Sequence, residues 1–272
     1  MKSYLSKLAL FCLIVATFFT ETTFAKAASP APPQNKELEY IMSSLYGKTG
    51  ILYLMNQSNE RDMLIGSNKP SQVSTKIPKF KSLIINIPAL ITLEQGPINE
   101  VTVIGDDNIM HVISAISDND QLVISAQRSF NTKQPLIIKI TAPTFYEVRI
   151  DSSTVYLQVA NIQQSSLNLD LKGHIKALFT GQIGTLNMNV RGVANISGHD
   201  FVTQNSTVKA EGKVGIALIA KENAHITATG SSRVDIYGQP KHKTSTTLGL
   251  STINFIEASA ETKKQRKIKV QP

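Results

Sequence analysis

A strand-based repeat of about 20 residues is the feature that most constrains what this chain can fold into. Five segments of similar texture follow one another between residues 144 and 240, and each carries a small residue at the same phase. The aligned positions are Ser152, Gly173, Gly192, Gly212 and Gly230. A repeat this short needs a neighbour on each side to bury its apolar face, which favours a β-solenoid. A β-sandwich also explains alternating strands, but does not by itself produce the constant interval.

The alternation of apolar and polar residues predicts which side chains point inward, because successive residues of a strand face opposite sides. The first strand of each coil predicts three inward columns: Tyr146, Leu167, Leu186, Val208, Ile226; Val148, Leu169, Met188, Ala210, Ala228; and Ile150, Leu171, Val190, Gly212, Gly230. The second strand of each coil predicts five inward pairs: Val155/Leu157, Ile175/Ala177, Ala194/Ile196, Val214/Ile216 and Val234/Ile236.

The outward positions of the repeat carry charges of opposite sign on adjacent coils. Stacked strands lie about 4.8 Å apart, so these charges should form pairs between coils. The predicted pairs are Arg149 with Asp170, Asp151 with Lys172, and Arg191 with Glu211. In this register, one pair of residues on adjacent coils carries charges of the same sign, Lys172 and Arg191. Exposed pairs of this kind each contribute about 0–1 kcal/mol, and they favour one register over slipped ones.

Short β-branched runs precede the repeat, and turn signals separate them. The runs are 83–87, 89–93, 101–104 and 121–124, and the turns are 95–97, 105–108 and 117–120. Since no segment of helical length lies between the runs, the whole of 80–240 is predicted to be an all-β, β-solenoid domain with about 18–21 residues per coil.

The N-terminus has the pattern of a signal peptide over residues 1–27. Lys2 and Lys7 precede an apolar run at 8–19, and Ala25-Lys26-Ala27 offers a cleavage site. The sole cysteine, Cys12, lies inside this run, so the mature chain would have no disulfide, catalytic thiol or cysteine-bound zinc. The expected location is the periplasm, the outer membrane surface or the medium.

Two further segments flank the predicted domain. Residues 28–79 form a leader and N-terminal capping segment, with a Pro-rich stretch at 28–36 and a short predicted helix at 37–46. Residues 241–272 form a basic C-terminal tail, which holds most of the chain's net charge of +8. This tail is either a solubilising end or a contact with an anionic membrane or lipopolysaccharide.

No catalytic, cofactor-binding or metal-binding residue can be assigned. The histidines occupy different phases of the repeat and lack metal-ligand spacing; they are His111, His174, His199, His225 and His242. The strand carboxylates each have a basic or amide neighbour, and Asp106, Asp107, Asp118 and Asp120 lie in predicted turns. Aromatic residues are 6% of the chain and Trp is absent, which disfavours both sugar-binding surfaces built on exposed aromatic rings and nucleic-acid binding.

Two runs and the closing coil resemble a known family. The runs are FKSLIINIPALITLEQGPINEVTVIGDDN (80–108) and DNDQLVIS (118–125), and the closing segment is GSSRVDIYGQP (230–240). They resemble the head-GIN domain family (DUF2807), described as a putative auto-transporter adhesin. Family coils carry a Gly-Ser-Gly-Asp turn, to which only Gly230-Ser231 comes close here. The resemblance implies a β-helical fold and a cell-envelope location, and brings no catalytic residues.

The predicted function is therefore that of a non-enzymatic exported envelope protein, a β-solenoid scaffold for adhesion or partner binding. Its partner, an envelope or surface component, is not identified by the sequence. Two alternatives remain open. One is a carbohydrate-active β-helix enzyme, since such enzymes share the fold. The other is a periplasmic partner-binding module that docks through residues 37–79.

Overall fold

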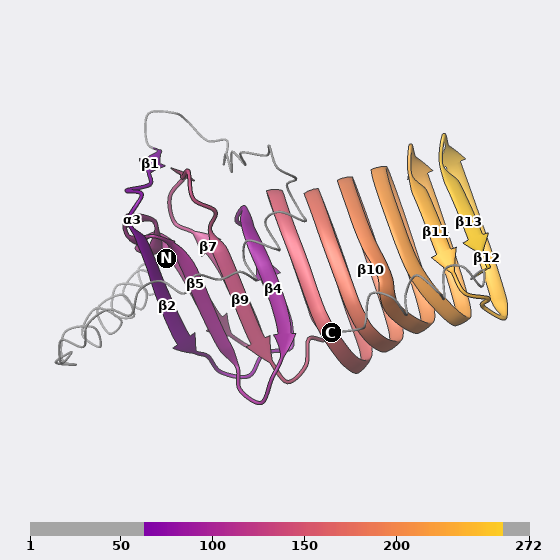
Figure 1. The fold of residues 1–272 in the computed structure, drawn as a ribbon, viewed down its shortest axis with the longest axis horizontal. Helices are drawn as coiled ribbons and strands as arrows, with labels where there is room; N and C mark the ends of the chain where they lie inside the picture. The colour runs from indigo at the N-terminus through magenta and orange to yellow at the C-terminus, as the bar shows by residue number, and fades with distance from the viewer. Residues whose placement is uncertain (1–62, 258–272) are drawn as a thin grey trace, which may run out of the picture. The chain divides into compact units, whose positions relative to one another are not determined.

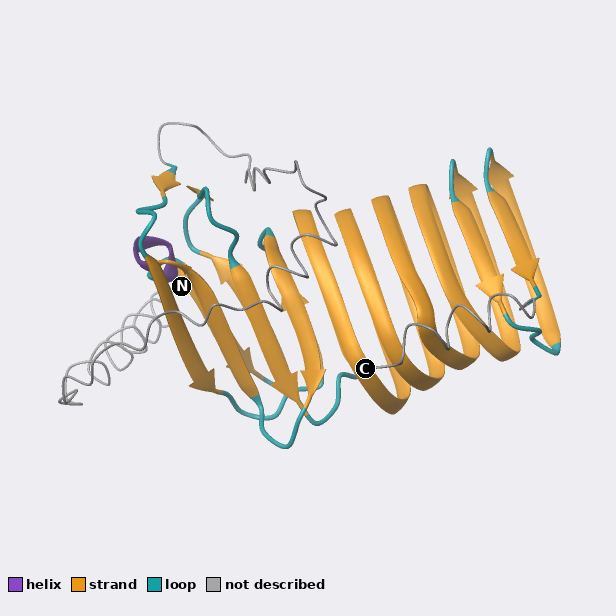
Figure 2. Ribbon diagram, in the orientation of Figure 1, coloured by secondary structure: helices purple, strands orange, loops and turns teal. Residues whose placement is uncertain are grey.

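The computed structural model describes residues 63–257, which form an all-β structure with almost no helix. The chain separates into two compact units, Met1–Ile51 and Leu52–Pro272, and the described residues belong to the second. They build a curled, open sheet (Figures 1 and 2). The predicted all-β class is confirmed. The predicted signal peptide, the helix at 37–46 and the basic cluster at 263–269 lie outside the described residues.

Short strands form the N-terminal part of the sheet. They are β1 (Leu64–Ile65), β2 (Pro70–Lys76), β3 (Ser82–Ile85), β4 (Ala89–Gln95), β5 (Glu100–Asp106), β6 (Ile113–Asp118), β7 (Gln121–Ala126), β8 (Phe130–Asn131) and β9 (Ile137–Ala142), with a one-turn helix α3 (Asp107–Met110) after β5. β7 pairs with β3 and β9 with β4, both parallel. β2 and β6 add antiparallel edges through β5 and β7. The four predicted strand runs coincide with β3, β4, β5 and β7.

The long strand β10 (Glu147–Gly230) spans 84 residues and curls repeatedly, as Figure 1 shows. Residues one repeat apart lie side by side: the Ser231 amide donates to the Gly212 carbonyl over 2.8 Å. β11 (Arg233–Tyr237) and β12 (His242–Gly249) continue the parallel pairing, and β13 (Thr252–Ile256) pairs with β11. We call the repeats coils 1 to 5, each named by its small residue: Ser152, Gly173, Gly192, Gly212 and Gly230.

The predicted column of small residues is confirmed. Each of its glycines packs on the backbone of the small residue one coil earlier, from Gly173 on Ser152 to Gly230 on Gly212, and Gly249 of β12 extends the column. All ten residues of the predicted second-strand pairs are buried. The core is thus a continuous stack of apolar side chains along the coils.

The predicted inward columns of the first strand are correct for coils 2 and 3 and displaced by two residues afterwards. In register with the glycines, Leu167 and Leu186 are followed by Ser206 and Ala224, both buried. The predicted members Val208, Ala210, Ile226 and Ala228 are buried too, each in the neighbouring column. Gly212 and Gly230 belong to the column of small residues instead.

Tyr146 was also placed incorrectly by the alternation, since it is 46% exposed. β10 begins at Glu147, so Tyr146 precedes the strand and its face is not fixed by the pleat. Phe145 is buried in its place, and its ring packs against that of Phe80 with centroids 6.2 Å apart. The ring contact adds to the packing between coil 1 and the strands β3 and β4 that pair with it.

Two of the three predicted charge pairs are present. Lys172 Nζ lies 2.9 Å from Asp151 Oδ2, and Arg149 Nε lies 3.8 Å from Asp170 Oδ2. The predicted pair of Arg191 with Glu211 is wrong. Arg191 instead pairs diagonally with Asp170 of the preceding coil, at 2.8 Å. Asp170 therefore pairs with two arginines, Arg149 of coil 1 and Arg191 of coil 3.

The sheet extends past both ends of the segment 80–240. β12 and β13 lie within the residues assigned above to the tail, and β1 and β2 within those assigned to the capping segment. Within 63–257 there is no helix of the length and apolar character needed to cross a membrane.

Candidate binding grooves on the outer face

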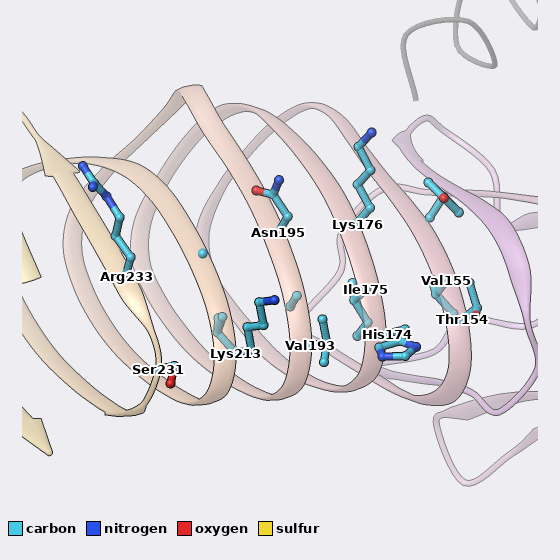
Figure 3. A pocket seen from close by; sticks show the side chains of 14 residues that line it. Thr154, Val155, His174, Ile175, Lys176, Val193, Asn195, Lys213, Ser231 and Arg233 are labelled. Carbon is cyan, nitrogen blue, oxygen red and sulfur yellow. The ribbon is translucent and has the colours of Figure 1, made fainter. Parts of the chain in front are cut away.

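A groove with a volume of about 610 Å³ crosses the outer face of all five coils, just after the column of small residues (Figure 3). We call it the basic groove. Two adjacent columns line it: Thr154, His174, Val193, Lys213 and Ser231, and Tyr156, Lys176, Asn195, Gly215 and Arg233. The strand residues between these columns, Val155, Ile175, Ala194 and Val214, face the core with their side chains and lie beneath the groove. The outward side chains therefore give the groove a polar and cationic lining, with apolar surface from Val193.

The lining of the groove holds basic residues and no acidic ones, although Arg233 pairs with Asp235, which lies beside the lining. Lys176, Lys213 and Arg233 line the groove together with His174, and none of the fourteen lining residues is acidic. Lys213 is exposed and forms no ion pair with a residue of the described range. In water-exposed grooves like charges gathered on one wall attract anions by summing their fields. The arrangement thus favours an anionic ligand.

Arg233 is oriented by its own strand. Its Nε donates to Asp235 Oδ2 over 2.9 Å, and this hydrogen bond raises the pKa of the guanidinium further. Asp235 also accepts a hydrogen bond of 2.7 Å from Asn254 Nδ2 of β13, which fixes the carboxylate. Asp235 engages Nε, and the Arg233 side chain is 66% exposed, so its terminal nitrogens are accessible to a ligand. A fork of donors is thereby presented at the coil 5 end.

Tyr156 contributes a hydroxyl at the opposite end. Burial raises the pKa of this phenol above its usual value. A phenol is protonated at neutral pH even without this shift, so the hydroxyl is a hydrogen-bond donor. Together with Thr154, Asn195 and Ser231 it supplies uncharged polar groups between the cations.

A second groove, of about 280 Å³, lies on the first strands of coils 1 to 4. Its side chains bond chiefly to one another: Asn187 Nδ2 donates to Asn168 Oδ1 over 2.8 Å, and Asn189 Nδ2 to Asp170 Oδ1 over 3.1 Å. It holds charges of both signs, Glu147 and Asp170 against Lys209. We therefore interpret this second groove as a ladder that stabilises the stack, and the basic groove as the candidate site.

Of the carboxylates predicted to lie in turns, Asp106 and Asp118 end strands and Asp107 begins α3, and the contacts of Asp106, Asp107 and Asp120 reach residues far away in the sequence. Asp107 accepts from Ser67 Oγ at 2.5 Å, and this bond lowers the pKa of the carboxyl. Asp106 is buried, and its Oδ2 accepts from Thr132 Oγ1 over 2.7 Å. Asp120, which follows β6, pairs with Lys81 at 2.7 Å. These contacts connect loops of the N-terminal part.

The histidines are dispersed. His174 lines the basic groove, whereas His199 packs edge-on against the ring of Tyr237 with centroids 5.0 Å apart. Among residues 63–257 no cluster of three or more His, Cys, Asp or Glu side chains has the arrangement of a metal site.

Sequence reasoning missed the basic groove, because its cations come from coils 2, 4 and 5 and are grouped only by stacking. A signal was nevertheless present. The first and third positions after each glycine of coils 2 to 5 never hold an acidic residue: they are His174, Lys176, Val193, Asn195, Lys213, Gly215, Ser231 and Arg233.

Comparison with known proteins agrees with the resemblance noted in the sequence. Residues 79–240 match the family model DUF2807, described as "Putative auto-transporter adhesin, head GIN domain". The match spans more than half of the chain. The chain belongs to the head-GIN domain family. A sequence search among proteins of curated function gives no match.

Solved structures resemble this head-GIN chain in fold. A protein from Bacteroides fragilis described as a putative adhesin superposes with a TM-score of 0.58 at 17% identity, covering 71% of this chain and all of that one. A putative adhesin from Parabacteroides merdae gives 0.42 at 13% identity, covering 72% and 99%. A putative lipid binding protein from Parabacteroides distasonis gives 0.41 at 15% identity, covering 71% and 99%. At 17% identity, the first likeness concerns the fold alone.

Proposed function

We propose that this head-GIN protein is a non-enzymatic, exported envelope protein whose sheet is a β-solenoid scaffold for adhesion. The observation that carries the proposal is the basic groove, which continues across five coils without an acidic residue in its lining. The family description and the description of the Bacteroides fragilis structure as an adhesin support it. The partner is an anionic surface component of an envelope or a host cell.

The β-solenoid interpretation rests on the pairing between coils. Parallel backbone contacts recur at the repeat interval, and the core runs continuously along the stack. Such a stack holds its outer columns at fixed spacing, because every coil is hydrogen bonded to both neighbours. A scaffold of this kind suits adhesion, which needs a surface of constant geometry more than a closed pocket.

Export is the part of the proposal that rests on the sequence. The predicted signal peptide at 1–27 and the family description both support a location in the periplasm, on the outer membrane surface or in the medium. The predicted basic tail would add a second cationic contact to an anionic envelope.

Binding of the purified chain to isolated bacterial envelopes and to cultured epithelial cells tests the proposal. The triple variant Lys176→Gln, Lys213→Gln, Arg233→Gln should lose at least about tenfold in affinity, because three cations act on one ligand. The matched control Lys139→Gln, Lys172→Gln, Lys209→Gln removes the same charge from other faces of the sheet and should bind like the wild type. Equal binding by both triple variants and the wild type would refute a role of the groove in adhesion.

A further inference from the structure

The basic groove is elongated along the stack of coils. It crosses five coils, and stacked strands are about 4.8 Å apart, so it extends for about 19 Å along the stack. A compact anion would contact one coil and leave most of this length empty. A linear ligand laid along the stack would meet every coil in turn.

The cations are spaced along this groove. Lys176 belongs to coil 2, Lys213 to coil 4 and Arg233 to coil 5. From the strand spacing, Lys176 and Lys213 are separated by about 10 Å along the stack. Between them, coil 3 presents Val193 and Asn195, an apolar and an amide side chain. The ligand that fits this sequence of groups carries anions at intervals, with uncharged polar and apolar surface between them.

We propose that the basic groove binds a linear acidic polysaccharide, a polymer of uronic acids, which lies along the stack of coils. This inference rests on the proposed function and names the anionic component of the surface. Sugar carboxylates would pair with the lysines, and the terminal nitrogens of Arg233 form a fork that matches a carboxylate in two parallel bonds. The hydroxyls of Thr154 and Ser231 and the amide of Asn195 would bond the sugar hydroxyls.

The lining distinguishes this ligand from other polyanions. Single-stranded nucleic acid is bound through a series of aromatic rings on which the bases stack. The groove contains the ring of Tyr156 at its coil 1 end and the imidazole of His174 on coil 2, and no series of rings along the rest of its length. A lipid surface is planar and is contacted by lysines on a convex or flat face, whereas these cations line a depression.

Titration of the full chain with oligogalacturonates of increasing length tests the proposal, with the methyl-esterified oligomers as uncharged ligands of the same backbone. We expect affinity to rise with length until the oligomer spans the groove and then to level off. It should fall as salt is added, because exposed charges are screened. The esterified oligomers should not bind.

Lys213→Gln should weaken oligogalacturonate binding about two- to fivefold, the amount expected for one exposed ion pair. Lys209→Gln, an exposed lysine of the same coil outside the groove, should bind like the wild type. The proposal is overturned if the wild type does not bind, if both lysine variants weaken binding equally, or if the esterified oligomers bind as tightly. It is also overturned if only anionic vesicles or single-stranded DNA bind. In each case groove-dependent binding to envelopes would still support the broader function. Release of unsaturated products, lost in Lys213→Gln, would overturn the assignment as a non-enzymatic site.

Discussion

At the scale of single residues, the column of glycines explains how the chain can turn at this edge while the backbones of successive coils stay in close contact. Gly212 has a φ of +109°, a conformation that other residues rarely adopt, and a Cβ added there would lie 2.4 Å from the Gly192 carbonyl oxygen. Neither the backbone angle nor the neighbouring coil leaves room for a side chain. This bare edge is what brings Lys213, the next residue, into the lining of the basic groove.

Replacing Gly212 with Ala should destabilise the fold by about 2–3 kcal/mol, since the substitution adds strain at a positive φ and a clash with backbone. Gly215→Ala on the same coil is the matched control. Its Cβ would meet nothing closer than 3.8 Å, so the stability should change by less than about 1 kcal/mol in either direction. Urea unfolding followed by circular dichroism measures both. Similar midpoints for the two variants would show that the column does not constrain the turn.

At the scale of elements, β10 shows why the register could be predicted only in part. The predicted inward columns slip by two residues after coil 3, and a slip of two keeps the same faces inward, so hydrophobic alternation cannot detect it. The cause is a polar inward position. Ser206 and Thr203 are buried and hydrogen bond to each other inside the coil, where the pattern favours an apolar residue. The glycines, which need a specific backbone conformation, marked the register better than the apolar residues did.

The polar side chains on the outer face of β10 pair between coils, and their contribution to stability can be measured. Asp170 accepts from Arg191 Nη2 at 2.8 Å and from Asn189 Nδ2, and its side chain is 31% exposed. Asp170→Asn should therefore cost about 1 kcal/mol, after allowance for solvent screening. Asp151→Asn, whose partner Lys172 is more exposed, should cost less than about 0.5 kcal/mol. The difference should shrink in high salt. A larger loss for Asp151→Asn in urea unfolding would contradict this ranking.

At the scale of the whole molecule, stability should behave as a sum over neighbouring coils. Each coil contacts mainly the coil before it and the coil after it. The stability of the first and last coils therefore depends on the strands that cover them. At the C-terminal end, β12 is exposed along its length, while Ile253 and Phe255 of β13 pack against the core. β12 and β13 lie beyond the residues matched by the family model, yet they cover coil 5.

A chain ended after Pro240 should lose about 2–4 kcal/mol of unfolding free energy, because removal of β12 and β13 exposes the apolar surface beneath Ile253 and Phe255. A chain ended after Glu257 retains both strands and should unfold at the same urea concentration as the full chain. Identical midpoints for the two truncations would mean that the sheet is complete at residue 240.

The sequence was sufficient for the class of fold and insufficient for the site, for one physical reason. Strand class, the column of glycines and the second-strand core follow from local patterns within each coil. The basic groove depends on which residues of different coils become neighbours, and Lys176, Lys213 and Arg233 are far apart in the chain. Net charge also hid the groove, since residues 28–240 are close to neutral as a whole and the positive excess lies toward the C-terminus.

Because each coil supplies its own share of the lining, the length of the basic groove is set by the number of coils. Duplication of one repeat would lengthen the groove by about 4.8 Å and leave the packing of the other repeats unchanged. Deletion of one would shorten it by the same step. Relatives that differ by whole repeats would then differ in how many units of a polymer they recognise, a change in specificity that needs no new residue at any existing position.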